Sequence, residues 1–292
     1  MKIKSLSLPS FMFVLLLLFI VNCTQQKQSD IILFKKNGGW CWFQDERAVI
    51  HNGVLVFGSV ATSQGFNGGE RAGNIEITAY DLESKTPLGT AILHENLEAD
   101  DHNTPALLML KDERLLAVYA THGSDSLIRY RITENPGDYL NWQPEQTMVR
   151  DARVNYSNLL YLSQENGGKG RIYDFYRGEH WNPNYVISDD QGKMWRYGGR
   201  LVTFEGRPYV KYTSDGVSKI HFITTEHHPR DFNNSIYHAY FENGKLYRSD
   251  GSFIKNLSDG PMQPDEGTKI FAGDSSHVAW TIDIHLDAII IR

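Results

Sequence analysis

Along most of the chain, short apolar and aromatic runs alternate with clusters of turn-forming residues. The runs are rich in β-branched and aromatic side chains and are bounded by Gly, Asn, Asp or Pro, which is the pattern of short β-strands. The predicted strands lie within residues 48–60, 73–82, 106–110, 114–122, 126–133, 158–163, 170–178, 184–190, 209–214, 219–225, 235–249 and 277–287. No long stretch repeats its apolar residues at the helical period. The pattern therefore predicts an all-β fold.

Two kinds of turn sequence indicate how these strands connect. Asn52-Gly53 and Asn243-Gly244 favour tight hairpins, because both residue types accept the positive φ that such turns require. The segment SDDQGKMW, residues 188–195, has the spacing S-x-D-x-G-x-x-W of the Asp-box found in sialidase-type β-propellers. In it the Asp side chain caps a tight turn, the Gly takes the bend and the Trp packs over it. Segments 213–222 and 248–253 look like weaker copies, so a propeller is favoured over a sandwich.

Composition narrows the class of protein. The 292 residues are 41% hydrophobic and 12% aromatic, which is enough for a substantial core and excludes a disordered chain. The net charge of -6 at pH 7 excludes a general nucleic-acid binder, which would need a basic surface. It leaves room for a local basic pocket that binds an anionic substrate.

The N-terminus has the features of an export signal. Lys2 and Lys4 precede an apolar run at 11–21, and Cys23 follows at once, which resembles a bacterial lipoprotein signal. We therefore expect a signal peptide at 1–22, a lipid on Cys23 that attaches the protein to the outer membrane, a flexible tether at 23–33 and one propeller domain at 34–292. The expected location is the cell surface or periplasm, or the medium if Cys23 carries no lipid. An uncleaved membrane anchor is disfavoured because the apolar run is short for a bilayer span.

Polar and titratable side chains gather just before the strand predicted at 106–110. Five of them stand side by side: Asp100, Asp101, His102, Asn103 and Thr104. Such a cluster suits either a functional site at the mouth of a strand or a turn that holds a structural histidine.

Several longer segments resemble the BNR-repeat family that includes the β-propeller ulvan lyases. They are GGWCWFQDERAV, DDHNTPALL, RIYDFYRGEHWNPNYVISDDQGKMW, RPYVKYTSDG and HHPRDFNNSIYHAYFENGKLYRSDG, and the resemblance extends from about Gly38 to Asp287. It implies a propeller of about seven blades and a polysaccharide lyase. Such an enzyme cleaves a uronate-containing, sulfated, ulvan-like glycan by β-elimination and needs no cofactor for catalysis.

β-Elimination needs a group that neutralises the uronate carboxylate, a base for the C5 proton and an acid for the glycosidic oxygen. The resemblance gives these roles to four residues: His102, His122, Tyr156 and Arg177. Arg177 ends an aromatic strand, where its guanidinium is placed to grip a carboxylate. The base and the acid are left unassigned among the two histidines and Tyr156, and Tyr161 is a less favoured substitute for Tyr156.

Further residues are expected to contact the substrate or a metal ion. The predicted substrate-binding residues are Asn103, Arg207, Tyr209, Tyr212 and Arg230. The region 219–238 is dense in histidine, and His221, His228 and His238 are predicted to hold a structural zinc ion, with Cys41 as a further ligand if its segment docks nearby. The alternative is that His228 and Arg230 line the substrate groove.

The length of the mature chain bears on the number of blades. At about 45 residues a blade, the mature chain fills nearer six blades than seven, so we expect a C-terminally incomplete propeller or one that closes differently.

Two alternative functions remain open. A sialidase-type glycoside hydrolase would share the fold but would need paired carboxylates and a Tyr nucleophile. A non-catalytic glycan-binding lipoprotein would use the same histidines and tyrosine only to line a cleft.

Overall fold

A computed structural model describes residues 31–287. The chain divides into a unit Met1–Phe34 and a compact unit Lys35–Arg292, and the strands of residues 31–287 all lie in the second. The predicted signal peptide, Cys23 and the tether up to residue 30 lie outside the described residues. Within residues 31–287, no helix combines the length and apolar character needed to cross a membrane.

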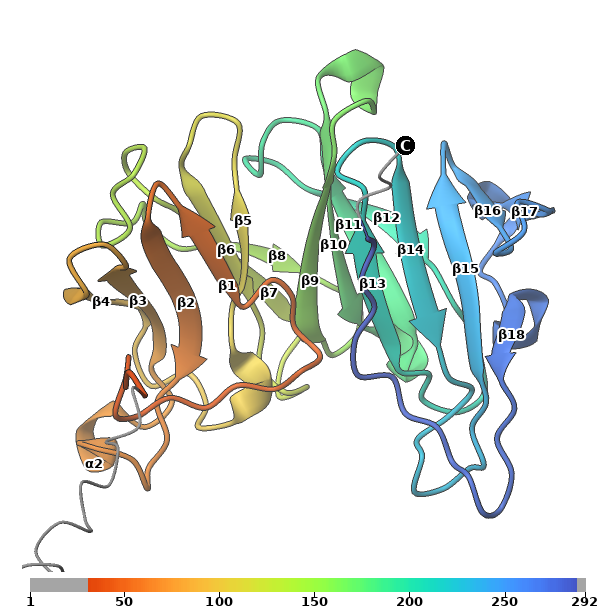
Figure 1. Cartoon of the computed structure of the whole chain (residues 1–292), viewed down its shortest axis with the longest axis horizontal. Coiled ribbons are helices and arrows are strands. Elements are labelled where there is room, and N and C mark those ends of the chain that lie inside the picture. The colour runs from red at the N-terminus through yellow and green to blue at the C-terminus, as the bar shows by residue number, and fades with distance from the viewer. Residues whose placement is uncertain (1–30, 288–292) are drawn as a thin grey trace, which may run out of the picture. The chain divides into compact units, whose positions relative to one another are not determined.

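Four antiparallel sheets follow one another along the chain, each built mainly from consecutive strands (Figure 1). The first contains β1 (Ala48–His51), β2 (Val54–Val60), β3 (Ile75–Asp81) and β4 (Thr86–His94). The second contains β5 (Ala106–Met109), β6 (Leu115–Tyr119), β7 (Leu127–Ile132) and β8 (Gln146–Val149). The third contains β9 (Asn155–Leu162), β10 (Arg171–Arg177), β11 (Pro183–Ser188) and β12 (Arg196–Arg200). The fourth contains β13 (Val210–Ser214), β14 (Lys219–Thr224), β15 (Ile236–Glu242), β16 (Lys245–Tyr247) and β17 (Phe253–Asn256), and β18 (Thr268–Phe271) pairs with β15.

Among residues 31–287, helical structure is confined to short turns between strands. They are α2 (Gly68–Arg71) and the 3-10 turns η1 (Asp101–Asn103), η2 (Asn166–Gly168), η3 (Glu179–Trp181), η4 (Leu257–Asp259) and η5 (Pro264–Glu266). A repeated four-stranded meander is the blade of a β-propeller, so the predicted all-β propeller class is confirmed.

The number of blades differs from the expectation of nearer six. Residues 31–287 form four blades, and no sheet among them closes on itself. The estimate was too high because residues 31–47 and most of 257–287 lie outside the blades, and because long connections such as 95–105 separate successive sheets.

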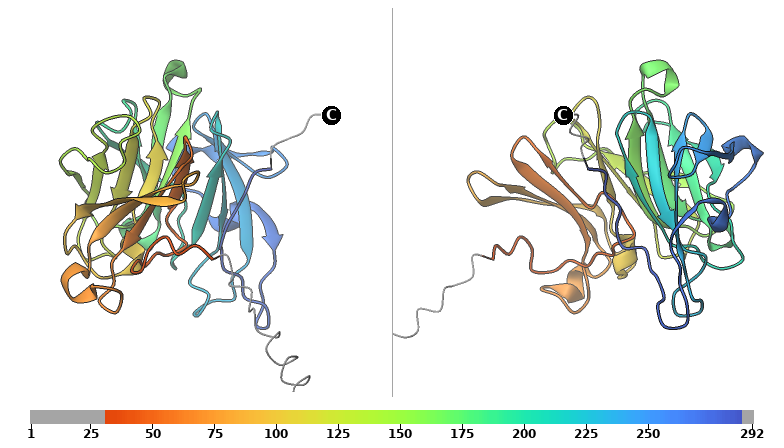
Figure 2. Two further views of the ribbon diagram at one scale, coloured as in Figure 1. Left: turned by 60° about the vertical axis from the view of Figure 1, so that its left-hand side comes forward. Right: turned by 45° about the vertical axis from the view of Figure 1, so that its right-hand side comes forward.

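Successive sheets lie side by side (Figure 1, Figure 2). Three apolar clusters fill the spaces between them. One lies between the first and second sheets, around Ile77 and Tyr119, and the next between the second and third, around Val118 and Ile172. The last lies between the third and fourth sheets, where the Phe175 and Tyr212 rings stack with centroids 4.5 Å apart. The apolar side chains of these clusters are thus buried between neighbouring blades.

The segment Gly39–Arg47 crosses the inner strands of several blades. Gly39 exchanges backbone hydrogen bonds with Val60, the Glu46 carbonyl accepts from Leu107, and the Asp45 carbonyl accepts from Leu159. The buried ammonium of Lys211, on β13, donates to the Trp42 carbonyl and to the Asp45 carboxylate. This segment therefore ties all four sheets together and fixes the side chains of residues 41–43 beside their inner strands.

The predicted turns are present in the structure. Asn52 and Gly53, like Asn243 and Gly244, take positive φ between paired strands, as two-residue hairpins require. In the Asp-box, the Asp190 carboxylate accepts hydrogen bonds from the backbone N–H groups of Lys193 and Met194. The Ser188 hydroxyl accepts from the Gly192 N–H. These bonds confirm the predicted architectural role of the motif.

The prediction of a strand at 277–287 is wrong. These residues pair with no strand, and beyond its own turn the segment makes one backbone hydrogen bond, from the Ala279 N–H to the Asn234 carbonyl. Ala279 and Thr281 are buried while Val278, Trp280 and Ile282 are exposed. The alternation in sequence therefore reflects a half-buried extended segment and not a strand.

Candidate active site

A cleft enclosing about 990 Å³ of space open to solvent lies where several loops meet at the ends of inner strands. Its walls come from the segment Gly39–Arg47, from η1, from the loop after β6, from β9 and β10, and from the loops around β13 and β14. The lining residues are Cys41, Trp42, Phe43, Asp101, His102, His122, Asn155, Tyr156, Arg177, Trp181, Arg207, Tyr209, His228, Arg230 and Trp280. All four predicted catalytic residues are therefore brought together, although 75 positions separate His102 from Arg177 in the chain.

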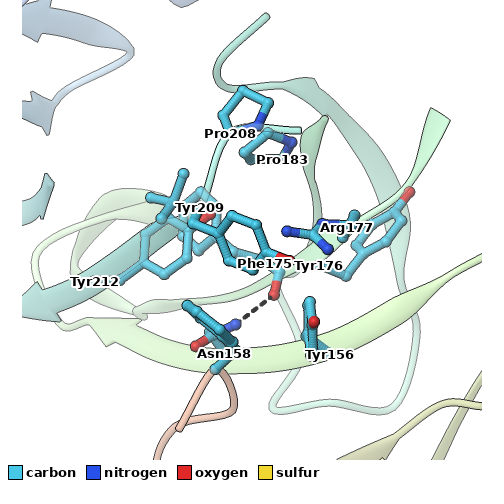
Figure 3. Close-up of a pocket in the computed structure, with 11 residues that line it drawn as sticks. Tyr156, Asn158, Phe175, Tyr176, Arg177, Pro183, Pro208, Tyr209 and Tyr212 are labelled. Carbon is cyan, nitrogen blue, oxygen red and sulfur yellow. Dashed lines mark hydrogen bonds between the residues drawn. The ribbon is translucent and has the colours of Figure 1, made fainter. Parts of the chain in front are cut away.

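A smaller cavity of about 290 Å³ adjoins the cleft and shares Phe43, Tyr156, Arg177 and Tyr209 with it (Figure 3). Its remaining walls come mainly from β10, through Phe175 and Tyr176, and from β13, through Val210 and Tyr212, and are completed by Asn158, Pro183 and Pro208. Figure 3 shows Arg177 among the rings of Tyr209, Phe175 and Tyr176.

One carboxylate holds both histidines. Asp100 precedes η1, and its Oδ1 atom accepts from the His102 backbone N–H at 2.9 Å, a short-helix cap. His102 Nδ1 lies 2.6 Å from Asp100 Oδ1, and His122 Nδ1 lies 2.9 Å from Asp100 Oδ2. The two rings stack with centroids 3.9 Å apart and planes 12° from parallel. Asp100 thus fixes the orientation of both imidazoles and leaves each Nε2 atom as the nitrogen that exchanges protons.

Electrostatics within this cluster favour a cationic His102. Burial alone would lower its pKa, but hydrogen-bond and charge interactions with Cys41, followed by those with Asp100, raise the pKa to about 9. Burial opposes ionisation of Asp100, yet hydrogen bonds from His102 and His122 lower its pKa to about 2. At neutral pH the cluster therefore holds an ion pair between Asp100 and His102.

Glu98 joins the two histidine-bearing segments from behind. Its Oε2 atom accepts from the His122 backbone N–H at 2.8 Å and from the Asn103 side chain at 3.0 Å. Its Oε1 atom accepts from the Ser124 hydroxyl at 2.5 Å. Asn103 is fully buried and does not line the cleft, so the structure places it as a support for η1 and not, as predicted, against a substrate.

A β-bulge brings Tyr156 into the cleft. Phe175 pairs with Asn158 and Arg177 with Asn155, so two residues of β9, Tyr156 and Ser157, face Tyr176 alone. Tyr156 has φ 58°, a left-handed conformation that is unfavourable for a bulky residue. The bulge lets Asn155 and Tyr156, which would alternate between faces of a regular strand, line the same cleft. Burial raises the pKa of the Tyr156 hydroxyl, partly offset by Arg177, so the phenol keeps its proton.

Arg177 is a nearly buried cation without a carboxylate partner. Its side chain belongs to a residue that is 7% exposed, and its guanidinium lies 5.0 Å from the ring centroid of Tyr156 and 4.2 Å from that of Tyr209. Among residues 31–287, no carboxylate comes within ion-pair distance of it. Arg177 therefore stacks on aromatic neighbours, which was the alternative to a role in the site, and it also lines the cleft.

Two more arginines lie on the rim. Arg207 is 3.5 Å from Asp231, and Arg230 Nη2 is 3.3 Å from His228 Nε2. Burial, followed by the charges of Arg207 and Arg230, lowers the pKa of His228, so this ring stays neutral. The predicted groove residues Arg207, Tyr209 and Arg230 therefore line the cleft.

The remaining predicted residues lie elsewhere. Tyr212 is buried against Phe175 and lines the smaller cavity of Figure 3 instead of the cleft. Tyr161, the less favoured substitute for Tyr156, lies near Lys111 and Gly170, away from the cleft.

The predicted zinc ligands are not brought together. His221 and His238 stack on neighbouring strands, with Nδ1 and Nε2 3.1 Å apart, whereas His228 lies in the cleft beside Tyr209 and Trp280. Among the described residues, the one group of three whose ligand atoms converge, within 4.8 Å, is Asp100, His102 and His122. Its atoms already hydrogen-bond one another.

Some lining residues were missed from the sequence. The lining residues Asn155 and Trp181 carry no spacing signal, although Asn155 directly precedes the predicted Tyr156, and neither does Glu98, which supports the histidine segments from behind the cleft. Cys41 was considered only as a metal ligand, and here its thiol lies beside His102. Trp280 belongs to the segment that was predicted as a strand.

Comparisons with known proteins agree with the fold. The family model described as a BNR repeat-containing family member matches residues 66–284. No curated protein sequence matches the chain.

Two polysaccharide lyases are among the solved structures similar to this chain. The first is a polysaccharide lyase PL25 ulvan lyase bound to -[GlcA(1-4)Rha3S]-, at 14% identity and a TM-score of 0.65, over 83% of this chain and 62% of that one. The second is the polysaccharide lyase Uly1, at 13% identity and a TM-score of 0.53, over 86% of this chain and 64% of that one. The chain thus spans less than two thirds of the length of either, and likeness at these identities concerns the fold.

Proposed function

We propose, from the premise that this chain belongs to the BNR repeat-containing family, that it is a polysaccharide lyase. In this proposal the cleft binds an anionic, uronate-containing polysaccharide and cleaves it by β-elimination. A sulfated, ulvan-like glycan is the first substrate to test, because a structural relative was solved with a glucuronate–sulfated rhamnose fragment.

The observation that carries the proposal is Arg177. A guanidinium that is nearly buried and lacks a carboxylate partner is costly unless a ligand supplies the anion. Its planar N–H groups match the two oxygens of a carboxylate. Arg207 and Arg230 on the rim add positive charge along the path of an anionic chain.

The histidine cluster and Tyr156 supply the proton transfers. The His102 and His122 rings stack with centroids 3.9 Å apart, and the raised pKa of His102 keeps its positive charge paired with Asp100. We assign the proton acceptor to the other imidazole, His122, and the proton donor to Tyr156. His122 takes the C5 proton, the C5–H electron pair becomes the C4–C5 double bond, and the C4–O bond breaks. The leaving oxygen takes the Tyr156 proton, while Arg177 and His102 stabilise the charge that develops on the carboxylate.

The glycoside hydrolase alternative fits the cleft less well. That chemistry needs two carboxyl groups across the scissile bond. Among the described lining residues, Asp101 is the one carboxylate, and the neighbouring Asp100 is occupied by both histidines.

Ultraviolet absorbance tests the proposal directly. Purified residues 24–292 are incubated with ulvan and other uronate polysaccharides, alongside His102→Ala and Arg177→Ala. An absorbance rise from the unsaturated uronate in wild type, lost in both variants, is the expected result. Binding without any rise, from protein shown to be folded, would favour the non-catalytic glycan-binding alternative, and new reducing ends without a rise would favour a hydrolase.

Export as a lipoprotein is a separate part of the proposal, based on the sequence around Cys23. Expression of the full chain and of Cys23→Ala in a bacterial host, followed by mass measurement, is the test. We expect wild type in the membrane fraction with the mass of a lipid-modified protein. Identical masses and fractions for the two proteins would contradict lipidation.

A further inference from the structure

Asn155 is buried in the cleft wall. It begins β9, is 1% exposed and lines the cleft between the His122 loop and Arg177. Its Oδ1 atom lies 3.2 Å from the position that a Cβ atom on Gly123 would take, so the amide packs against the backbone next to His122. The proposed proton transfers do not involve this side chain.

The Asn155 amide has no hydrogen-bond partner on either atom. Nδ2 and Oδ1 are both buried and unpaired, and within residues 31–287 Asn155 is the one amide side chain for which both atoms are in this state. Native proteins pair nearly all buried polar groups, because an unpaired amide loses its hydration without compensation. An unpaired amide in a cleft wall therefore points to a ligand that completes it.

The position of Asn155 indicates which ligand group that is. Asn155 stands directly opposite Arg177 in the register of β9 and β10, and both line the cleft. The bulge at Tyr156 keeps Asn155, Tyr156 and Arg177 in one wall. An amide N–H beside a guanidinium offers donors to two oxygens of one carboxylate, while the amide oxygen is free to accept from a sugar hydroxyl.

We propose that Asn155 is a substrate-binding residue that, with Arg177, holds the uronate carboxylate and stabilises the enolate formed when the C5 proton leaves. The inference rests on the proposed lyase function and adds a residue to it. Because the charge on the carboxylate oxygens grows in the transition state, the amide contributes more to kcat than to KM.

Three variants test the proposal: Asn155→Ala, Asn155→Asp and Asn184→Ala. For Asn155→Ala on ulvan, or on the uronate polymer that wild type cleaves fastest, we expect kcat to fall about 100-fold and KM to change less than about three-fold. Its Tm should stay at or above that of wild type, because no hydrogen bond within the protein is lost. Asn155→Asp has nearly the same shape, but its charge repels a carboxylate, so its loss of activity should be larger.

Asn184 is the matched control, since it lies in the same sheet and is also 1% exposed, but its amide donates to the Asn182 carbonyl and accepts from the Tyr197 hydroxyl. Asn184→Ala should lower Tm and leave kcat within about three-fold of wild type. An Asn155→Ala enzyme with wild-type kcat, or a tolerated Asn155→Asp, would overturn the inference while the lyase function stands.

Binding separates failure of the inference from failure of the function. If wild type cleaves no polymer, calorimetric titration with ulvan decides the role of Asn155. Binding that Asn155→Ala weakens ten-fold or more keeps Asn155 as an anion-binding residue without lyase activity. Binding that Asn155→Ala leaves unchanged, or no binding by wild type, overturns the inference.

Discussion

Tyr156 carries the backbone feature on which the candidate site depends most. Its left-handed conformation, within the bulge of β9, turns the phenol toward the two histidines, whose ring centroids lie 5.6 and 6.2 Å away. Strained backbone of this kind is typical of positions where a side chain must be aimed. The strain is consistent with the role of proton donor.

Tyr156→Phe is therefore expected to lower kcat by about 10²- to 10⁴-fold, the usual contribution of a positioned acid. Stability should change by less than about 0.5 kcal/mol, because the ring and its contacts remain. Absorbance kinetics and thermal unfolding measure the two effects. Tyr161→Phe is the control, since Tyr161 lies outside the cleft, and equal kcat in both variants would exclude the proposed role.

The Asp100 cluster predicts a dependence on pH. The pKa of His102 is raised to about 9, so its imidazolium stabilises the fold fully below its ordinary 6.5, and this contribution is lost as pH rises through 9. The pKa of Asp100 is lowered to about 2, so its contribution is present above its ordinary 3.8 and is lost as pH falls through 2. Both contributions are complete between about pH 4 and 6.5.

Activity should follow the charge of His102 at alkaline pH. The rate is expected to fall as pH rises through about 9, and Asp100→Asn should move this fall to lower pH because the carboxylate no longer favours the imidazolium. Initial rates between pH 5 and 10 measure the shift. Asp101→Asn provides the comparison, because Asp101 also approaches His102 Nδ1 but is 51% exposed. Superimposable profiles for Asp100→Asn and wild type would contradict the ion pair.

Among the elements, the Asp-box hairpin links the second and third blades. Gly192 has φ 82°, and a Cβ atom there would meet Leu116 of β6 at 3.3 Å. Gly192→Ala should therefore destabilise the protein by about 1–2 kcal/mol without altering the kcat of the folded enzyme. Thermal unfolding gives the measurement. Gly69→Ala is the control, because nothing lies within 4 Å of the added Cβ there, and an equal change in Tm for both would refute the explanation.

Local sequence patterns predicted the turns and strands better than they predicted which segments contact one another. The Asn-Gly hairpins and the Asp-box were predictable because each turn is satisfied within a few residues. The segment 277–287 was not, because alternation reports burial on one side and says nothing about a neighbouring strand. For the same reason His228 was grouped with His221 and His238, although a loop carries it into the cleft and the other two stay on β14 and β15.

The same difference between local patterns and long-range contacts separates the site residues that were predicted from those that were not. Family-like segments carried His102, His122, Tyr156 and Arg177, and the structure brings them together. The roles of Glu98 and Asn155 were not predictable, since each depends on contacts between separate segments of the chain. Glu98 joins η1 to the His122 loop, and Asn155 faces the cleft because of a bulge in β9.

At the scale of the whole molecule, charge is distributed unevenly. The chain has a net charge of -6, yet three arginines line the cleft: Arg177, Arg207 and Arg230. An anionic polymer is therefore attracted to the cleft and repelled by much of the remaining surface.

Ionic strength should change KM more than kcat. We expect KM for an anionic polysaccharide to rise between 0.05 and 0.5 M salt, because salt screens the rim arginines and hardly affects the buried Arg177. Steady-state kinetics at several salt concentrations provide the measurement. A KM independent of salt for wild type, and equal to that of Arg207→Ala, would show that the rim charges do not guide the substrate.

The cleft brings together segments from near both limits of the described chain, and three of the six tryptophans line it: Trp42, Trp181 and Trp280. The Trp42 and Trp280 rings lie with centroids 5.6 Å apart, and each is more than a third exposed. The protein therefore contains its own fluorescent probe of the cleft. A bound polysaccharide that displaces water from these indoles should shift their emission to shorter wavelength, which allows ligands to be screened without a label and without turnover.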